Sequence, residues 1–193
     1  MEIMDNSSNG SADPVQQSLE LATLAGGCFW CTEAVFRRIK GVAAVMPGYS
    51  GGSIADPSYE AVSAGQTGHA EAVQIQFDPA VISFAKLLDV FWAVHDPTTL
   101  NRQGADVGPQ YRSAIFYHSD EQKNIAEKSK AALAQSGKYS DPVVTEITKF
   151  THFYPADESH REFYERNRDY GYCRLVIDPK IKKLYKAFQA DLK

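Results

Sequence analysis

The sequence predicts an α+β domain in which helices pack on a mixed, mainly antiparallel sheet. Segments that alternate apolar and polar residues are interspersed with segments of helical periodicity, without the regular repeat of a parallel sheet. The chain has 193 residues, 44% of them hydrophobic and 23% charged, enough for one core. We therefore expect a single domain over residues 21–193. A mobile arm, rich in Ser, Asn and Asp, precedes it over residues 1–20.

The first half of the chain predicts strand, helix, strand and strand. LATLAGG (21–27) has strand character and ends in a Gly-Gly turn, and CFWCTEAVFRRIK (28–40) has helical composition until Gly41 stops it. VAAVMPGYSGG (42–52) is extended and ends in a Gly-rich turn. EAVQIQFDP (71–79) alternates as a strand does, and its Asp-Pro pair ends it.

The second half predicts helices separated by a long loop and short strands. Ser83 is a plausible N-cap for a helix that ends before Pro97, and Ser119 with Gln122 has capping-box spacing ahead of a helix to about residue 136. SAIFYHS (113–119) and PVVTEITKF (142–150) are expected strands, and the tail holds two further helical stretches. The loop at 95–112 is long for a compact domain, which favours a functional role.

Composition excludes several classes of function. The formal net charge is -4 and no Lys/Arg run could follow a phosphate backbone, so we expect no nucleic-acid partner. The apolar runs are too short to cross a bilayer and no signal sequence opens the chain, which predicts a cytoplasmic protein without membrane contact. Three cysteines cannot form a fully paired disulfide framework, so thiol chemistry is the better interpretation.

Cys28 and Cys31 lie at the expected junction between strand and helix. The unpaired N–H groups at a helix start favour an anion, which predicts a lowered pKa for Cys28 and a nucleophilic role. Cys31 lies one turn further on, about 5–6 Å away at Cβ, and could resolve an oxidised Cys28 after a small rearrangement. Two alternatives stay open: the cysteines are small core residues, or they bind zinc, although no second ligand pair is present and we expect no metal.

Glu71 shares its strand parity with Val73, Ile75 and Phe77 and therefore faces the apolar side. Burial raises a carboxyl pKa, so this side chain can stay protonated near neutrality and donate a proton. The alternative is a glutamate at the strand end that turns to solvent.

Several ordered motifs together resemble the A-type peptide methionine sulfoxide reductases: GGCFWCTEAVF, GYSGG, TGHAEAV, HDPTTLNRQGADVGPQYRSAIFY and FYPADESH. The resemblance runs from about Leu24 to Cys173 and implies a two-layer α+β fold with a ferredoxin-like core. The chain departs from the usual pattern at Ala105, where a polar residue is common, and at Pro109, where a small hydroxylated one is frequent. These changes affect fine geometry and remove no reacting group.

The resemblance implies that Cys28 is the catalytic cysteine and that Phe29 and Trp30 form the apolar pocket for the sulfur-bound methyl group. The alternative is that both rings are only core residues, an interpretation with more weight for Phe29 than for Trp30. The reaction it implies is reduction of methionine S-sulfoxide, free or within proteins.

Four further residues receive a role from the resemblance. Glu71 matches the acid that protonates the sulfoxide oxygen, Tyr59 and Tyr111 match tyrosines that hydrogen-bond this oxygen, and Asp106 matches an acidic residue that orders the site. Taken alone, either tyrosine would more often be structural.

Recycling involves Cys31 and Cys173. Attack on the sulfoxide leaves Cys28 as a sulfenic acid, which condenses with a second thiol to a disulfide. The resemblance implies thioredoxin as external reductant, replaceable by dithiothreitol, and no bound cofactor; we expect a monomer. We favour Cys31 as the first resolving residue, because Cys173 precedes an apparently ordered helical end and would need a mobile segment to reach Cys28.

Two other classes of function compete. A general thiol-disulfide oxidoreductase could use the same Cys-x-x-Cys, although aromatic residues separate the cysteines and no Pro lies between them. A metal-binding interaction module is the non-enzymatic alternative.

Overall fold

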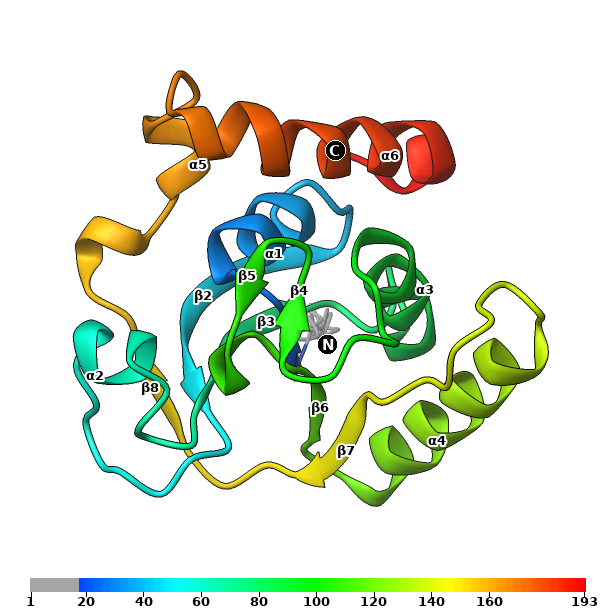
Figure 1. The fold of residues 1–193 in the computed structure, drawn as a ribbon. Coiled ribbons are helices and arrows are strands. Elements are labelled where there is room, and N and C mark those ends of the chain that lie inside the picture. The colour runs from blue at the N-terminus through cyan, green and yellow to red at the C-terminus, as the bar shows by residue number, and fades with distance from the viewer. Residues whose placement is uncertain (1–17) are drawn as a thin grey trace, which may run out of the picture.

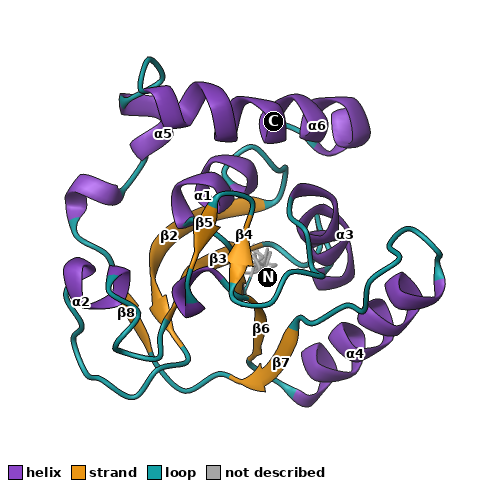
Figure 2. Cartoon of the chain, viewed as in Figure 1, coloured by secondary structure: helices purple, strands orange, loops and turns teal. Residues whose placement is uncertain are grey.

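The computed structural model describes residues 18–193, in which a six-stranded mixed sheet carries the fold (Figures 1 and 2). Its strands, in the spatial order β7-β6-β1-β3-β2-β8, are β7 (Glu146–Lys149), β6 (Ser113–Tyr117), β1 (Glu20–Gly26), β3 (Ala70–Phe77), β2 (Val42–Ser50) and β8 (Phe153–Pro155). β6 and β7 pair in parallel and the other neighbours are antiparallel. The predicted α+β class is confirmed.

The helices cover the sheet and extend along its periphery (Figure 1). They are α1 (Phe29–Phe36), α2 (Tyr59–Ser63), α3 (Phe84–Val94), α4 (Asp120–Gln135), α5 (Phe163–Arg166) and α6 (Asp178–Phe188), with a π-helical turn at Cys173–Ile177. α1 and α3 contact β1, and α6 packs on both helices from outside. α1 is therefore enclosed between the sheet and the C-terminal helix.

The two faces of the sheet bury different side chains. Large apolar residues fill the face under α1 and α3, including Leu24, Ile75, Phe77 and Phe91. The opposite face carries a smaller cluster in which Phe116 covers alanines of β1, β3 and β6. Both faces of β3 are thus buried near its start, which is the part of the strand that carries Glu71.

The two predicted N-caps are confirmed. Ser83 Oγ accepts from Lys86 N at 3.2 Å, and Ser119 Oγ accepts from Gln122 N at 3.1 Å. The reciprocal half of the second capping box is absent, because Gln122 Oε1 accepts from His118 N instead. The serine alone therefore caps α4.

The predicted helix over residues 28–40 is too long, because α1 ends at Phe36. Tight backbone hydrogen bonds follow, from Arg38 N to Val35 O and from Ile39 N to Phe36 O, and Ile39 bridges to Leu192 near the end of the chain. Seven of the eight residues of α1 are buried, so its apolar pattern contains no one-sided stripe that could mark where it stops.

The predicted loop over residues 95–112 is also partly wrong. It contains a small hairpin of β4 (Arg102–Gln103) and β5 (Asp106–Val107) and a 3₁₀ turn at Pro109–Tyr111. α2 and β8 were not predicted, because they have five and three residues, too few for a periodic pattern. These short elements nonetheless border the site described below.

The N-terminal arm predicted over residues 1–20 lies almost wholly outside the described residues. Within residues 18–193, no helix combines the length and the apolar character needed to cross a bilayer.

Replacing Ile75 with Ala should lower the free energy of unfolding by about 2–5 kcal/mol, because this side chain is fully buried in the central strand and its removal leaves a cavity. Gln76→Ala, at the neighbouring exposed position of the same strand, should change it by less than about 0.5 kcal/mol. Urea denaturation monitored by circular dichroism measures both. Equal losses in the two variants would contradict the assigned faces of β3.

Candidate active site

Two glycines bring the backbone of β1 close to its neighbours just before Cys28. A Cβ on Gly26 would lie 2.9 Å from Cε2 of Phe91, and one on Gly27 would lie 2.5 Å from Cγ of Gln103. Gly27 also has a φ of +91°, which side chains rarely allow. Glycine is therefore required where the strand turns into α1, and the turn leaves Cys28 at the N-cap of that helix.

Cys28 and Cys31 form a buried thiol pair, with 6% and 1% of their surfaces exposed. Burial raises the pKa of Cys28 well above its usual range, and a hydrogen bond to Cys31 and the charges of Cys31 and Glu71 raise it further. The hydrogen bond from Cys28 lowers the pKa of Cys31 to about 7. The pair therefore shares a proton and titrates as a unit.

The expectation that the helix start lowers the pKa of Cys28 was wrong, and the structure shows the physical reason. The N–H of Phe29, the first of the helix, donates to Glu71 Oε2 at 3.0 Å. The N–H of Cys31 is also engaged, because it donates to Cys28 O at 3.1 Å. These donors are therefore not free to stabilise a thiolate on Cys28, and desolvation determines the direction of its shift.

Glu71 lies in the same buried region, with 2% of its surface exposed, and the predicted orientation toward the apolar side is confirmed. Burial raises its pKa to about 8, while the hydrogen bond from Phe29 lowers it in part. The charges of Asp106 and Cys31 raise it further. At neutral pH this carboxyl is therefore mainly protonated.

The aromatic residues between and beyond the two cysteines pack against one another. The ring of Phe29 lies 6.4 Å from that of Trp30 and 6.5 Å from that of Tyr59, and Trp30 stacks on Phe163 at 3.7 Å. His160 packs against the same rings, although the sequence pattern indicates no role for it beyond membership of a motif. Its ring centroid lies 4.4 Å from that of Tyr59, and its Nδ1 accepts a hydrogen bond from Trp30 Nε1 at 3.2 Å. Phe29 and Trp30 therefore belong to one apolar wall.

Tyr59 and Tyr111 keep their protons. Burial raises the pKa of both hydroxyls, and the nearby Glu71 and Cys28 raise both further. A protonated phenol can donate a hydrogen bond to an oxygen that develops negative charge. The structure thus brings both tyrosines to the region of Cys28 and Glu71, from α2 and from the 3₁₀ turn.

Tyr172 is a second residue that the sequence analysis missed. Its hydroxyl donates to Asp106 Oδ2 at 2.6 Å and lies 3.8 Å from Cys31 Sγ, so Asp106 approaches the thiols through this tyrosine. Its neighbour Cys173 is fully buried at the start of the π-helical turn, and burial raises the pKa of that thiol. All three cysteines are free.

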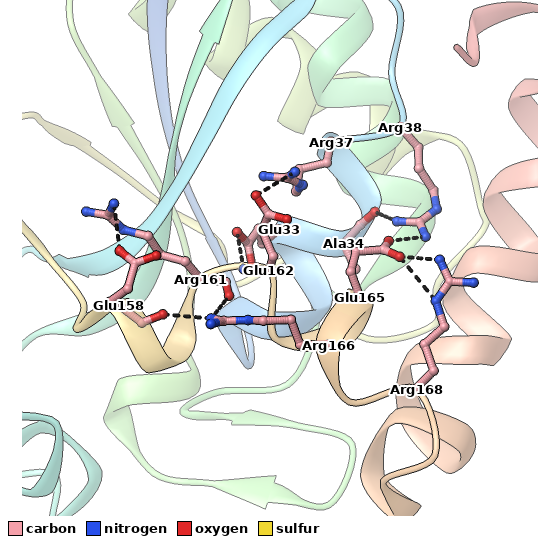
Figure 3. Close-up of polar contacts among 10 residues, drawn as sticks. All are labelled: Glu33, Ala34, Arg37, Arg38, Glu158, Arg161, Glu162, Glu165, Arg166 and Arg168. Carbon is pink, nitrogen blue, oxygen red and sulfur yellow. Dashed lines mark hydrogen bonds and ion pairs between the residues drawn. The ribbon is translucent and has the colours of Figure 1, made fainter.

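Polar contacts hold the C-terminal segment on α1 (Figure 3). Both carboxylate oxygens of the buried Glu33 accept from Glu162 N, at 2.9 and 3.0 Å, and burial raises the Glu33 pKa to about 7. Arg38 donates to Ala34 O and to Glu165 Oε1, each at 2.5 Å. This attachment positions the histidine and the tyrosine that the segment contributes. Within residues 18–193, no three His, Cys, Asp or Glu side chains converge as metal ligands would.

An α+β scaffold with two coupled buried thiols beside a protonated carboxyl defines a thiol-dependent oxidoreductase. The model of the family described as "Peptide methionine sulfoxide reductase" matches residues 20–192. This chain therefore belongs to the peptide methionine sulfoxide reductase family.

Relatives and solved structures agree with this assignment. The chain is 57% identical over 170 residues to a peptide methionine sulfoxide reductase MsrA of Sulfolobus acidocaldarius. The alignment covers 88% of this chain and 96% of the relative. It resembles Mxr1 from Saccharomyces cerevisiae in reduced form, with a TM-score of 0.75 and 36% identity over 84% of this chain and 92% of that one. For Mxr1 in complex with Trx2 the TM-score is 0.53, at 27% identity over 80% and 91%.

The raised pKa of Glu71 predicts a pH-dependent stability. The folded protein holds the Glu71 proton more tightly than the unfolded chain does. The stability that this proton adds to the free energy of unfolding is therefore complete below about pH 4 and is lost as the pH rises through about 8. The free energy of unfolding of Glu71→Gln, measured by urea denaturation between pH 5 and 8.5, should therefore decline less than that of the unchanged protein. Glu20→Gln, at an exposed position, serves as the control. Identical slopes in all three proteins would contradict a buried, protonated Glu71.

Proposed function

We propose that this protein reduces the S epimer of methionine sulfoxide, free or within proteins, to methionine. The observation that carries the proposal is the 3.0 Å hydrogen bond between Glu71 and the N–H of Phe29, the residue that follows Cys28. It supports placing a proton donor and a sulfur nucleophile in one buried pocket. We treat residues 21–193 as the catalytic domain and the cytoplasm as its compartment.

Glu71 and Cys28 act at opposite ends of the sulfoxide bond. Glu71 gives its proton to the oxygen, which makes the sulfur electrophilic, and the thiolate of Cys28 attacks that sulfur. Tyr59 and Tyr111 donate hydrogen bonds to the oxygen, and Asp106 orders the site through Tyr172. The attack by Cys28 joins the two sulfurs and leaves the protonated oxygen, as a hydroxyl, on the former sulfoxide sulfur. The hydroxyl then moves to the sulfur of Cys28 as the S–O bond and the new sulfur–sulfur bond break, so Cys28 becomes a sulfenic acid and methionine leaves.

The hydrogen-bonded thiol pair supplies the nucleophile despite the raised pKa of Cys28. As the pH passes about 7 the pair loses one of its two protons, and the proton that remains lies on Cys28 because the pKa of Cys28 is raised and that of Cys31 is lowered. Transfer of that proton from Cys28 to Cys31 generates the attacking thiolate on Cys28 without releasing a proton to solvent. Phe29 and Trp30 form the apolar wall that receives the methyl group and excludes water.

Cys31 is proposed as the first resolving residue because it lies one helical turn from Cys28 and each thiol shifts the pKa of the other. Its sulfur attacks the sulfenic acid, a disulfide forms and water leaves. Cys173 follows Tyr172, which touches Cys31, so exchange can then pass the disulfide to the C-terminal segment. Thioredoxin reduces it, and the protein, as a monomer, needs no bound cofactor. The Mxr1–Trx2 complex supports this partner.

We also infer a ferredoxin-like, mainly antiparallel core for the two layers. The order β6-β1-β3-β2, with α1 after β1 and α3 after β3, supports it.

The alternative of a general thiol-disulfide oxidoreductase has less support. Such an enzyme must expose a sulfur to large protein disulfides, whereas Cys28 and Cys31 are 6% and 1% exposed.

The single-turnover rate of sulfoxide reduction should rise toward pH 7, as the thiol pair loses its proton, and fall above about pH 8, as Glu71 ionises. Glu71→Gln should slow the reaction about 10²–10⁴-fold and remove the alkaline decline, because an amide is not an acid. Glu33→Gln is a control for the shape of the pH profile: this carboxyl is also buried, with a raised pKa, but it contacts the C-terminal segment instead of the thiols. Its rate can fall because that segment is less firmly held, but the alkaline decline should remain because Glu71 is intact. Stopped-flow measurements across pH 5–9.5 test this, and an alkaline decline that persists in Glu71→Gln would exclude Glu71 as the acid.

Disulfide mapping after one equivalent of S-sulfoxide, without reductant, tests the order of the cysteines. The chain with Cys173→Ser should still form Cys28–Cys31, whereas Cys31→Ser should accumulate a sulfenic acid on Cys28 that dimedone traps. Cys28→Ser should keep both of its remaining thiols reduced, because the proposed reaction begins with attack by Cys28. A stable sulfenic acid in Cys173→Ser, with rapid Cys28–Cys173 formation in Cys31→Ser, would reverse the order.

A further inference from the structure

A groove of about 310 Å³ lies beside the aromatic wall, between β8 and the start of α2. Three tyrosines and two aspartates line it together with neighbouring prolines: Tyr49, Tyr59, Tyr154, Asp56 and Asp157. Figure 1 shows α2 beside β8 at one edge of the sheet. The mechanism proposed above uses only Tyr59 of these residues.

The strand register connects this groove to the catalytic acid. Glu71 of β3 lies opposite Tyr49 of β2, which lies opposite Tyr154 of β8. Directly opposed residues of antiparallel strands share a face, so the three side chains form a continuous row from the acid to the groove. Tyr59 extends the connection, because its ring faces both the groove and Phe29.

Tyr49 is a built polar feature of the groove wall. Only 2% of its surface is exposed, and its ring packs 5.7 Å from that of Phe29. Its buried hydroxyl has no hydrogen-bond partner among residues 18–193. Burial and the nearby charges of Glu71 and Asp157 keep its pKa raised. A buried hydroxyl without a partner is costly, which favours a role in binding over a purely structural one.

The charge of the groove is negative and uncompensated. Asp56 and Asp157 are exposed, and neither forms an ion pair within the described part of the chain. Glu60 adds a third carboxylate close to Tyr49. Burial lowers the pKa of His160, so the nearby imidazole is neutral and does not offset these charges. Carboxylates combined with the faces of tyrosine rings attract cations.

We propose that this groove binds a Lys or Arg side chain that flanks the oxidised methionine in a polypeptide substrate. The inference rests on the proposed function, because its ligand is the neighbour of the reacting residue. The cationic side chain lies between Asp56 and Asp157 and packs its aliphatic stem on the tyrosines, while the methionine sulfoxide enters the aromatic pocket beyond Tyr59. The groove therefore selects polypeptides by charge at a place separate from the reacting atoms.

Three blocked peptides of equal length, with Lys, Gln or Glu on both sides of methionine S-sulfoxide, test the proposal on the unchanged protein with dithiothreitol as reductant. At low ionic strength kcat/KM should fall in the order Lys, Gln, Glu, with about 3–10-fold between the extremes, as expected for exposed carboxylates. At about 0.5 M salt the ratio should shrink to less than about twofold. Equal kcat/KM for all three would overturn the groove assignment and leave the reductase standing, whereas failure to reduce any of them would overturn the proposed function itself.

A pair of double variants locates the selectivity. Asp56→Asn with Asp157→Asn should bring the Lys-to-Glu ratio close to one; Asn suits position 56, whose φ is +44°. The control, Asp89→Asn with Asp141→Asn, removes two exposed carboxylates outside the groove and should retain the ratio. Loss of the ratio in both double variants would assign it to net charge and overturn the groove. Retention of the Lys-to-Glu ratio in the variant with Asp56→Asn and Asp157→Asn would also overturn the groove assignment.

Discussion

The hydrogen bond from the Phe29 N–H to Glu71 connects the sheet, the first helix and the chemistry. A buried carboxyl on β3 accepts the first donor of α1, so the residues on either side of that bond cannot move independently. Removal of either partner would leave a polar group buried without its counterpart. The same bond explains why the thiol at the N-cap is governed by burial: the donors of the helix start are occupied by the carboxyl and by the tight first turn.

The C-terminal segment completes what the sheet begins. Glu33 accepts from Glu162 N, and Arg38 donates to Glu165, which together hold this segment on α1. The segment returns His160 to the aromatic wall and Tyr172 to the thiols. Because Tyr172 also bonds to Asp106 on the small hairpin, three separate regions of the chain meet at Cys31. The site is therefore assembled from distant segments, and its geometry depends on how firmly that segment is docked.

Local signals in the sequence predicted the features that depend on neighbouring residues. Serine caps mark where α3 and α4 begin, and alternation on β3 orients Glu71, because backbone sterics and period suffice for both. The raised pKa of Cys28 comes first from burial by the folded chain, and the helix-start N–H of Phe29 that could oppose it donates to Glu71, 42 residues away. His160 reaches Trp30 across 130 residues. The hairpin of β4 and β5 is too short to alternate. No local pattern encodes such pairings, although the family resemblance placed Tyr59, Tyr111 and Asp106 near one another.

The close approach of Cys31 to Cys28 has a consequence for the durability of the catalyst. Under the proposed reaction, each turnover leaves an oxidised sulfur that peroxide could drive to the irreversible sulfinic state. A thiol one helical turn away, in a pocket almost closed to solvent, competes with that solute at a very high effective concentration. Enclosure thus shields the enzyme from hyperoxidation by the same oxidants that create its substrate.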